Sequence, residues 1–170
     1  MDVLTPGLEN YLEAILRVGL EKEVVRVKDI EKLLNVKAPS IVESVKSLAE
    51  RDLVEYERYG YIKLTEKGTR IAREIYRRHK MLAGFFNRII GVDLETATQD
   101  ACAIEHYLSK KTLDHLLKFV EFVESHPERE PMWLSSFHYY VKYGELPDYC
   151  RKRREEVKKG KINNGKEKNC

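Results

Sequence analysis

Three potential metal ligands stand close together near the middle of the chain. Cys102, Glu105 and His106 belong to the segment Asp100-Ala101-Cys102-Ala103-Ile104-Glu105-His106. On a helix they occupy positions i, i+3 and i+4, which share one face. A thiolate, a carboxylate and an imidazole together can bind a transition metal. The ordinary alternative is a solvated polar stripe, so a metal site needs support from the rest of the chain.

The bulk composition fits a mostly helical protein with one core or two small ones. Of the 170 residues, 42% are hydrophobic and 35% are charged. No apolar run approaches the ~20 residues that span a bilayer, and no signal segment opens the chain. The three cysteines are odd in number and far apart, which argues against a disulfide framework. We therefore expect a cytoplasmic protein with no membrane partner.

The positive net charge of +3 comes from the end of the chain. Residues 151–170 hold nine Lys or Arg against three Glu, a balance of +6. Residues 1–150 hold 22 basic and 25 acidic residues and carry −3. Any prediction of DNA binding must therefore depend on local arrangement.

The first fifty residues predict a helix-turn-helix. A first helix begins at Thr5-Pro6, where a hydroxyl can cap and proline suits the first turn. A short helix carrying Ile30 ends at Asn35, and another begins at Ala38-Pro39 with a regular apolar stripe. Two such helices joined by a tight turn are typical of DNA-reading domains.

The pattern then changes to alternation, which predicts a β-hairpin from Val54 to Leu64 that turns at Tyr59-Gly60. A helix-turn-helix followed by a hairpin is a winged helix, whose structural alternative is a protein-contact domain. We expect phosphate contacts from Arg26, Lys28, Ser40, Ser44, Arg51 and Arg58. We expect the residues that meet the bases to be Lys37, Ala38, Pro39 and Ser40.

The middle of the chain predicts a helical hub. One helix follows Thr65 and ends at Gly91, one is capped by Asp93 and continues through Leu108, and one begins at Ser109. Their apolar surface is too large for one small subunit to hide. We therefore expect a homodimer formed by residues of roughly 70–125.

This order of segments resembles the diphtheria-toxin-repressor family of metal-dependent transcriptional regulators. The resemblance covers residues of about 5–125 and depends on the winged helix, Arg78-His79, Ile89-Ile90-Gly91-Val92-Asp93 and Cys102-Ala103-Ile104-Glu105-His106-Tyr107-Leu108-Ser109. It implies a repressor that binds operator DNA as a homodimer when metal is bound, controls metal-uptake genes and has no small organic substrate.

The resemblance also implies a ligand set for one metal site. The matched positions are Asn10, Glu13, His79, Cys102, Glu105 and His106. Cys102 matches the iron-responsive branch and Glu13 the manganese-responsive branch, whereas Asn10 fits neither. The iron branch's ancillary site is expected to be missing, because its Glu and second His are replaced by Ala83 and Thr98. The expected ion is Fe(II), with Mn(II) second and Zn(II), Co(II) or Ni(II) as substitutes in vitro.

The predicted organisation has four parts. A winged helix-turn-helix with a small β-hairpin wing (1–70) precedes a helical dimerisation and metal-binding domain (71–125). A short helical extension (126–150) and a basic, disordered tail (151–170) follow, with no room for the small C-terminal β-barrel that many iron-branch members carry. The fold class is thus mostly α.

Two other functions remain open at this stage. One is a metal-independent winged-helix repressor that uses Cys102 as a redox switch. The other is a metalloenzyme with Glu105 as base, which is disfavoured because nothing in the sequence suggests a substrate pocket beside a DNA-reading head. We expect no enzymatic activity.

Overall fold

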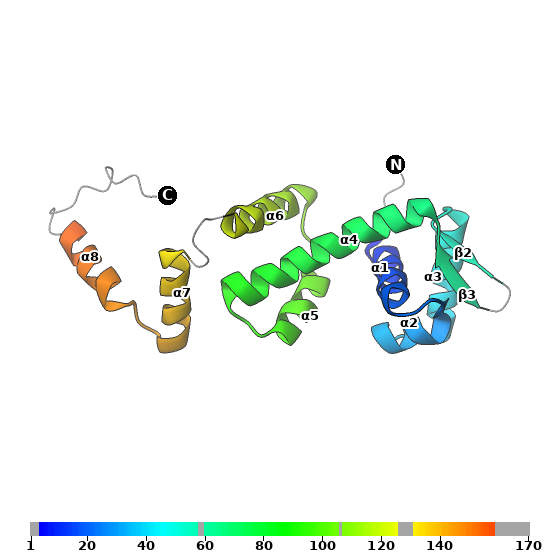
Figure 1. Cartoon of the computed structure of the whole chain (residues 1–170), viewed down its shortest axis with the longest axis horizontal. Coiled ribbons are helices and arrows are strands. Elements are labelled where there is room, and N and C mark those ends of the chain that lie inside the picture. The colour runs from blue at the N-terminus through cyan, green and yellow to red at the C-terminus, as the bar shows by residue number, and fades with distance from the viewer. Residues whose placement is uncertain (1–3, 58–59, 106, 126–130, 159–170) are drawn as a thin grey trace.

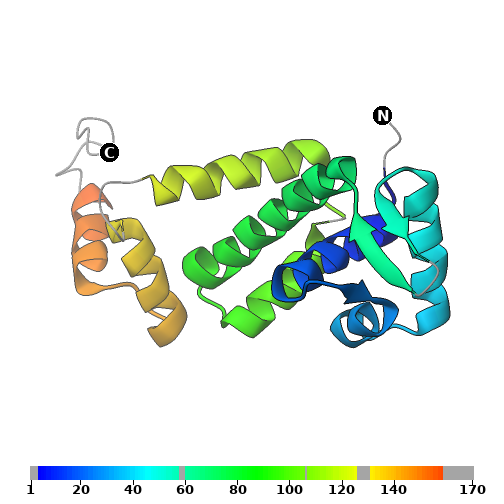
Figure 2. The same cartoon turned by 45° about the vertical axis from the view of Figure 1, so that its right-hand side comes forward.

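The computed structural model describes residues 4–57, 60–105, 107–125 and 131–158. The chain is mostly helical with one small antiparallel sheet. Figures 1 and 2 show an elongated arrangement with the winged helix at one end, a helical hub in the middle and two helices at the other end. Helix α4 (Glu66–Gly84) connects the winged helix to the hub. None of the described helices combines the length and apolarity that a bilayer crossing requires.

The winged helix forms as the sequence predicts. Thr5 caps its first helix by accepting a hydrogen bond from the Leu8 amide, and Asn35 ends the second in the left-handed conformation, which asparagine tolerates. Its elements are α1 (Pro6–Glu21), β1 (Val25–Arg26), α2 (Val27–Leu34), α3 (Ala38–Glu50), β2 (Val54–Tyr56) and β3 (Tyr61–Leu64).

The sheet contains a strand that the sequence did not reveal. Its order is β1-β3-β2, with Val25 opposite Ile62 and Val54 opposite Leu64. The hairpin of β2 and β3 confirms the predicted change of period. Strand β1 is only two residues long, too short to show any alternation.

The core of the winged helix extends into α4 (Glu66–Gly84). Ala72 and Ile75 of α4 pack with the apolar faces of α1, α2 and α3. Further along the same helix, Leu82 and Ala83 belong to the hub core with Ala101. One helix therefore contributes to both cores, and His79 lies between its two apolar segments.

The hub comprises α4, a π-helical turn η1 (Phe85–Ile90), α5 (Leu94–Ile104) and α6 (Lys110–Glu124). Gly91 ends the turn with φ of 86°, and Asp93 and Ser109 cap the next two helices, as predicted. Two details differ from the prediction. The long helix changes to π geometry at Phe85, and α5 ends at Ile104 instead of continuing through Leu108.

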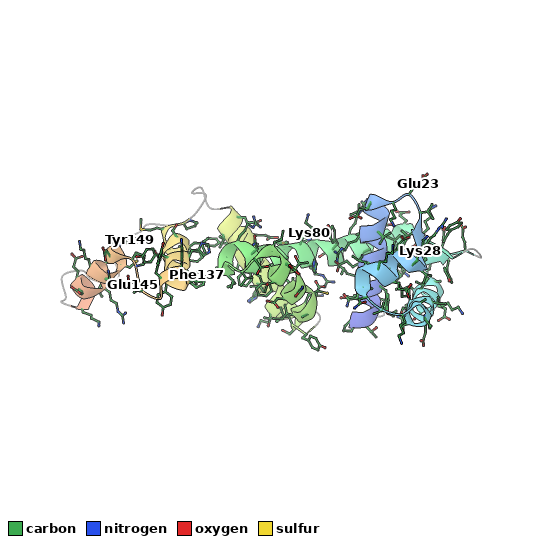
Figure 3. The ribbon with its side chains drawn as sticks, turned by 90° about the horizontal axis from the view of Figure 1, so that it is seen from below. Glu23, Lys28, Lys80, Phe137, Glu145 and Tyr149 are labelled. Atoms are coloured by element: carbon green, nitrogen blue, oxygen red, sulfur yellow. The ribbon has the colours of Figure 1, made fainter. Side chains whose placement is uncertain are left out.

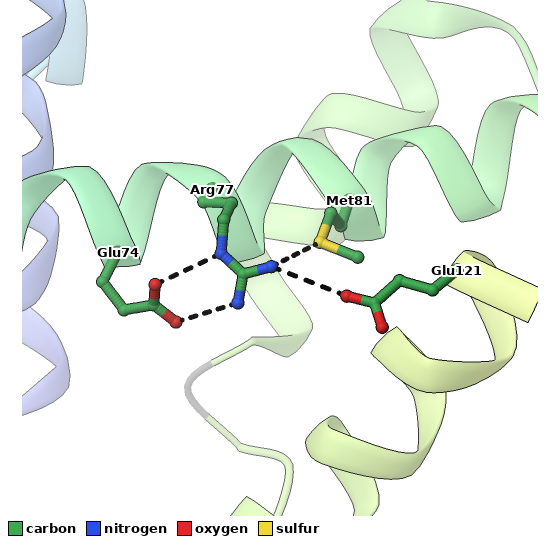
Figure 4. A network of polar contacts seen from close by, with 4 residues as sticks. All are labelled: Glu74, Arg77, Met81 and Glu121. Atoms are coloured by element: carbon green, nitrogen blue, oxygen red, sulfur yellow. Dashed lines mark hydrogen bonds and ion pairs between the residues drawn. The ribbon is translucent and has the colours of Figure 1, made fainter. Parts of the chain in front are cut away.

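Arg77 links α4 to α6 on the surface of the hub (Figure 4). Its guanidinium donates to both oxygens of Glu74 at 3.1 and 3.2 Å, and Nη1 lies 3.8 Å from Glu121 Oε1. All three side chains are about half exposed, so the network contributes little free energy.

Two further helices, α7 (Met132–Tyr143) and α8 (Asp148–Lys158), lie at the end far from the winged helix. Figure 3 shows Phe137, Glu145 and Tyr149 at this end and Glu23 and Lys28 at the other. Helix α7 packs on the hub through Leu134, which shares a small core with Ile89.

The prediction of a disordered tail from residue 151 differs from the structure over residues 151–158, which belong to α8. Arg151 pairs with Asp148 and Glu145, and these contacts stabilise the first turn. Helix α8 buries none of its residues. Residues 159–170 lie outside the described part of the chain.

Candidate metal centre

Three buried ionisable side chains from distant parts of the sequence meet between the winged helix and the hub. Glu13 of α1, His79 of α4 and Glu105, directly after α5, each offer one ligand atom within 4.8 Å of the others. Their exposed fractions are 3%, 4% and 8%. Burying such groups is costly unless they are paired or bind an ion, so this cluster needs a chemical explanation.

His79 is the central member of the cluster. Its Nδ1 lies 3.6 Å from Glu105 Oε1 and has no hydrogen-bond partner among the described residues. The neighbouring Glu105 carboxylate raises the pKa of His79 against the opposing effect of burial, and Glu13 adds to the rise. Without a metal, two carboxylates thus favour a proton on this imidazole.

Cys102 and Asn10 lie beside the cluster and connect α5 with α1. The Cys102 thiol donates to Asn10 Oδ1 at 3.7 Å, although the residues are 92 positions apart in sequence. Burial raises the pKa of Cys102, and the negative charges of Glu105 and Glu13 raise it further. The thiol is only partly buried and is not among the three side chains whose ligand atoms gather within 4.8 Å.

A groove of about 630 Å³ opens onto these side chains. Its lining includes Asn10, Arg17, His79, Cys102 and Thr98. Arg17 was absent from the predicted site, although its position four residues after Glu13 could have indicated it. Its Nη1 lies 3.6 Å from Glu13 Oε1.

The expected loss of an ancillary site concerns two other positions. Ala83 is buried in the hub core and offers no ligand atom. The hydroxyl of Thr98 donates to the carbonyl of Leu94 at 2.7 Å. The remaining predicted ligand, His106, lies outside the described residues.

The donor set suits a divalent transition metal. A buried imidazole nitrogen without a hydrogen-bond partner stands beside two carboxylates, and a thiol lies at the edge of the group. Nitrogen and oxygen ligands bind Mn(II), Fe(II) and Zn(II), and sulfur adds preference for the softer ions.

Comparison with known proteins gives the same two-part division. Residues 3–62 match the N-terminal DNA-binding domain of iron-dependent repressors, and residues 65–134 match their metal-binding and dimerisation domain. The HTH-type transcriptional regulator MntR of Bacillus pumilus (strain SAFR-032) is 38% identical over 125 residues, which cover 74% of this chain and 86% of the relative. MntR of Bacillus subtilis (strain 168) is 36% identical over 126 residues, covering 74% and 88%.

The chain belongs to the iron-dependent repressor family. It is therefore a metal-dependent transcriptional repressor, with a DNA-binding domain and a domain that binds a divalent metal and dimerises. This confirms the resemblance and the mostly helical fold drawn from the sequence. Because the relatives are transcriptional regulators, the family also supports the prediction that the chain is not an enzyme.

Solved structures of the family share the fold. T. acidophilum IdeR superposes with a TM-score of 0.59 at 26% identity and covers 71% of this chain. A manganese-dependent transcriptional repressor in complex with manganese gives 0.61 at 26% identity and covers 74%. This chain spans little more than half of those two chains, 56% and 57%.

The predicted DNA-contacting residues of this repressor lie on the winged helix. Lys37, Pro39 and Ser40 are exposed at the start of α3, Ala38 is half-buried there, and Lys28 is exposed on α2. Ser44 and Arg51 are half-buried, and Arg58 lies outside the described residues. Arg26 is exposed, but its guanidinium already contacts Tyr61. It donates to the Tyr61 hydroxyl and lies 5.0 Å from the centre of the Tyr61 ring.

Proposed function

We propose that Glu13, His79 and Glu105, together with Cys102, Asn10 and His106, bind the regulatory metal ion of this repressor. One observation carries the proposal: the side chains of Glu13, His79 and Glu105 are buried and their ligand atoms lie close together. They come from the winged helix, from the helix that joins it to the hub, and from the hub itself. Two carboxylates and an imidazole nitrogen in one buried place are explained better by a cation than by packing.

We propose Fe(II) as the physiological ion, with Mn(II) as the second candidate. The partly buried Cys102 thiol beside Asn10 supports Fe(II), because sulfur prefers softer ions than Mn(II). The two carboxylates support Mn(II), which prefers oxygen ligands, and one similar solved structure is described as a manganese-dependent transcriptional repressor in complex with manganese. The chemistry of residue 102 therefore decides between the two candidates.

A metal bound at this centre would supply direct bonds between the winged helix and the hub. Weaker contacts already join the same parts: Arg78 Nη2 lies 3.5 Å from Glu9 Oε2, and Cys102 donates to Asn10. The Arg78 and Glu9 side chains are 27% and 24% exposed, and this ion pair and the thiol hydrogen bond are each weaker than a direct metal–ligand bond. The orientation of the two α3 helices of a dimer would thus be held loosely without metal and firmly with it.

In this arrangement DNA and metal would bind with positive cooperativity. Both ligands favour the conformer in which the two α3 helices match the operator spacing, so each raises the affinity for the other. A coupling free energy of about 3 kcal/mol corresponds to a change of roughly a hundredfold in DNA affinity. The expected role is repression of metal-uptake genes in the cytoplasm when the ion is abundant.

The test is anaerobic fluorescence anisotropy on a promoter fragment, with and without Fe(II), Mn(II), Zn(II) and Ni(II). Wild-type protein should bind DNA about a hundredfold more tightly with the activating ion. His79→Gln and Glu13→Gln should lose this stimulation while sedimenting as the same dimer. Two variants serve as controls. Glu21→Gln removes an exposed carboxylate from α1, the helix of Glu13, and Glu95→Gln removes an exposed carboxylate from the first turn of α5, outside the cluster.

Full stimulation in both His79→Gln and Glu13→Gln would contradict the proposed ligand set. Equal DNA affinity of the wild-type protein with and without every ion would contradict the coupling itself.

A further inference from the structure

Arg17 places a permanent positive charge beside the candidate metal centre. It follows Glu13 by one helical turn on α1, and its Nη1 lies 3.6 Å from Glu13 Oε1. The Glu13 side chain is 4% exposed, whereas that of Arg17 is 36% exposed. A permanently charged guanidinium therefore already partners a carboxylate of the candidate metal centre.

The charge of Arg17 also affects other side chains of the candidate metal centre. It lines the same groove as Asn10, His79 and Cys102. Its charge opposes the rise in pKa that Glu105 causes at His79 and that burial causes at Cys102. A cation there disfavours a second cation among the same side chains.

Arg17 is not held in place by the core. Its neighbours on α1 that pack into the winged helix are Ile15, Leu16 and Val18. The guanidinium lies on the groove side and is partly in contact with solvent, so it can turn outward without opening the apolar packing.

We propose that Arg17 is a resident cation that competes with the metal for Glu13 and so sets the metal concentration at which the repressor responds. This inference rests on the proposed metal centre. In the absence of metal, Arg17 neutralises part of the buried negative charge of Glu13 and Glu105. Metal binding requires Arg17 to release Glu13, and the free energy of the lost ion pair subtracts from metal affinity.

Competition with the metal and a purely structural role of Arg17 have different consequences for metal binding. If Arg17 only stabilised α1, its removal would lower the stability of the metal-free and metal-bound forms alike. As a competitor, Arg17 stabilises only the metal-free form. Its removal should then increase metal affinity and enlarge the rise in melting temperature that metal causes.

The test measures Mn(II) binding to the full-length protein by competition with a fluorescent chelator, because Mn(II) is stable in air. Arg17→Met keeps a long side chain without charge and should bind Mn(II) up to about fivefold more tightly than wild type. Arg17→Gln is a second neutral variant in case the first folds poorly. Arg17→Lys restores the charge and should return the affinity to within about threefold of wild type.

Arg73→Met is the matched control, because it removes an exposed cation from α4 outside the groove. It should leave Mn(II) affinity unchanged, which separates the local effect of Arg17 from the effect of net charge. Unchanged or weaker Mn(II) binding in both neutral variants would overturn the role of Arg17. An equal gain in Arg73→Met would also overturn it.

Failure of the underlying metal centre has a different signature. If Glu13→Gln binds Mn(II) as tightly as wild type, or wild type binds neither Mn(II) nor Fe(II), the proposed ligand set itself is wrong. If Glu13→Gln loses binding but neither neutral Arg17 variant gains it, only the competition is wrong.

Discussion

Gly68→Ala should strongly destabilise the winged helix, because Gly68 stands where α4 meets the start of the wing. A Cβ atom added at Gly68 would lie 1.8 Å from the carbonyl oxygen of Leu53 and 2.8 Å from its carbonyl carbon. Carbon and oxygen atoms rarely approach within about 3.2 Å, so the two backbones must separate by more than an ångström. Neither side is a flexible side chain that could yield.

The expected magnitude follows from the contacts that hold this junction. The Thr65 amide donates to the Leu53 carbonyl at 3.1 Å, and the Thr65 hydroxyl donates to the Asp52 carbonyl at 2.9 Å. Weakening both hydrogen bonds costs about 1 kcal/mol each, and overpacking adds roughly 1–3 kcal/mol. These terms sum to about 3–5 kcal/mol, and the higher helix propensity of alanine offsets about 1 kcal/mol of them, so we expect a loss of about 2–4 kcal/mol in the free energy of unfolding.

The assay is urea denaturation followed by circular dichroism. Gly7→Ala is the matched control: it replaces a helical glycine that has nothing within 4 Å of the added Cβ. It should leave stability unchanged or raise it by up to about 1 kcal/mol. If Gly68→Ala and Gly7→Ala change the unfolding midpoint alike, the steric reasoning is refuted.

Two further predictions concern charge and metal preference. The Lys22 ammonium donates to Asp29 Oδ1 at 2.5 Å and lowers the pKa of Asp29 below its ordinary value of 3.8. The ionised carboxylate therefore stabilises the folded state above pH 3.8. This stabilisation is lost as the pH falls through the lower pKa of the folded state. Because Lys22 is half exposed, Asp29→Asn should cost only about 1 kcal/mol at pH 7 in urea denaturation, and this cost should shrink as the pH is lowered below 3.8. A cost that stays the same below pH 3.8 would contradict this. Cys102→Asp replaces sulfur by oxygen and should shift the ratio of Co(II) to Mn(II) affinities about tenfold toward Mn(II), with loss of the near-ultraviolet thiolate–Co(II) absorption band. An identical Co(II) spectrum in wild type and variant would show that Cys102 is not a ligand.

The sequence predicts most of the fold because the local signals are strong. Thr5, Asp93 and Ser109 each cap a helix with their side-chain oxygen, and Gly91 ends a helical segment with positive φ. These features depend only on a few neighbouring residues, so they can be predicted from a single sequence. The π-turn at Phe85–Ile90 and the two-residue strand Val25–Arg26 have no such signal, because tertiary contacts determine both.

The sequence predicts which residues could form the candidate site but not their geometry. Helical spacing indicated that Cys102 and Glu105 share a face, and the family resemblance supplied Glu13 and His79. Spacing could not indicate that Glu13, His79 and Glu105 converge while Cys102 bonds to Asn10 at the edge. That division depends on how α1 and α5 pack against α4, and it brings together residues 92 positions apart in sequence.

The position of His79 on α4 gives a physical reason for placing a sensor there. Ile75 belongs to the core of the winged helix and Leu82 to that of the hub, so His79 lies where apolar packing passes from one body to the other. A ligand held within either core could change only the stability of that core. A ligand held between them changes how the two cores are joined, and a few kcal/mol there alters the orientation of the DNA-reading helix without unfolding either part. In the proposed competition, the partial exposure of Arg17 would allow this cation to leave the junction without disturbing the packing on either side of it.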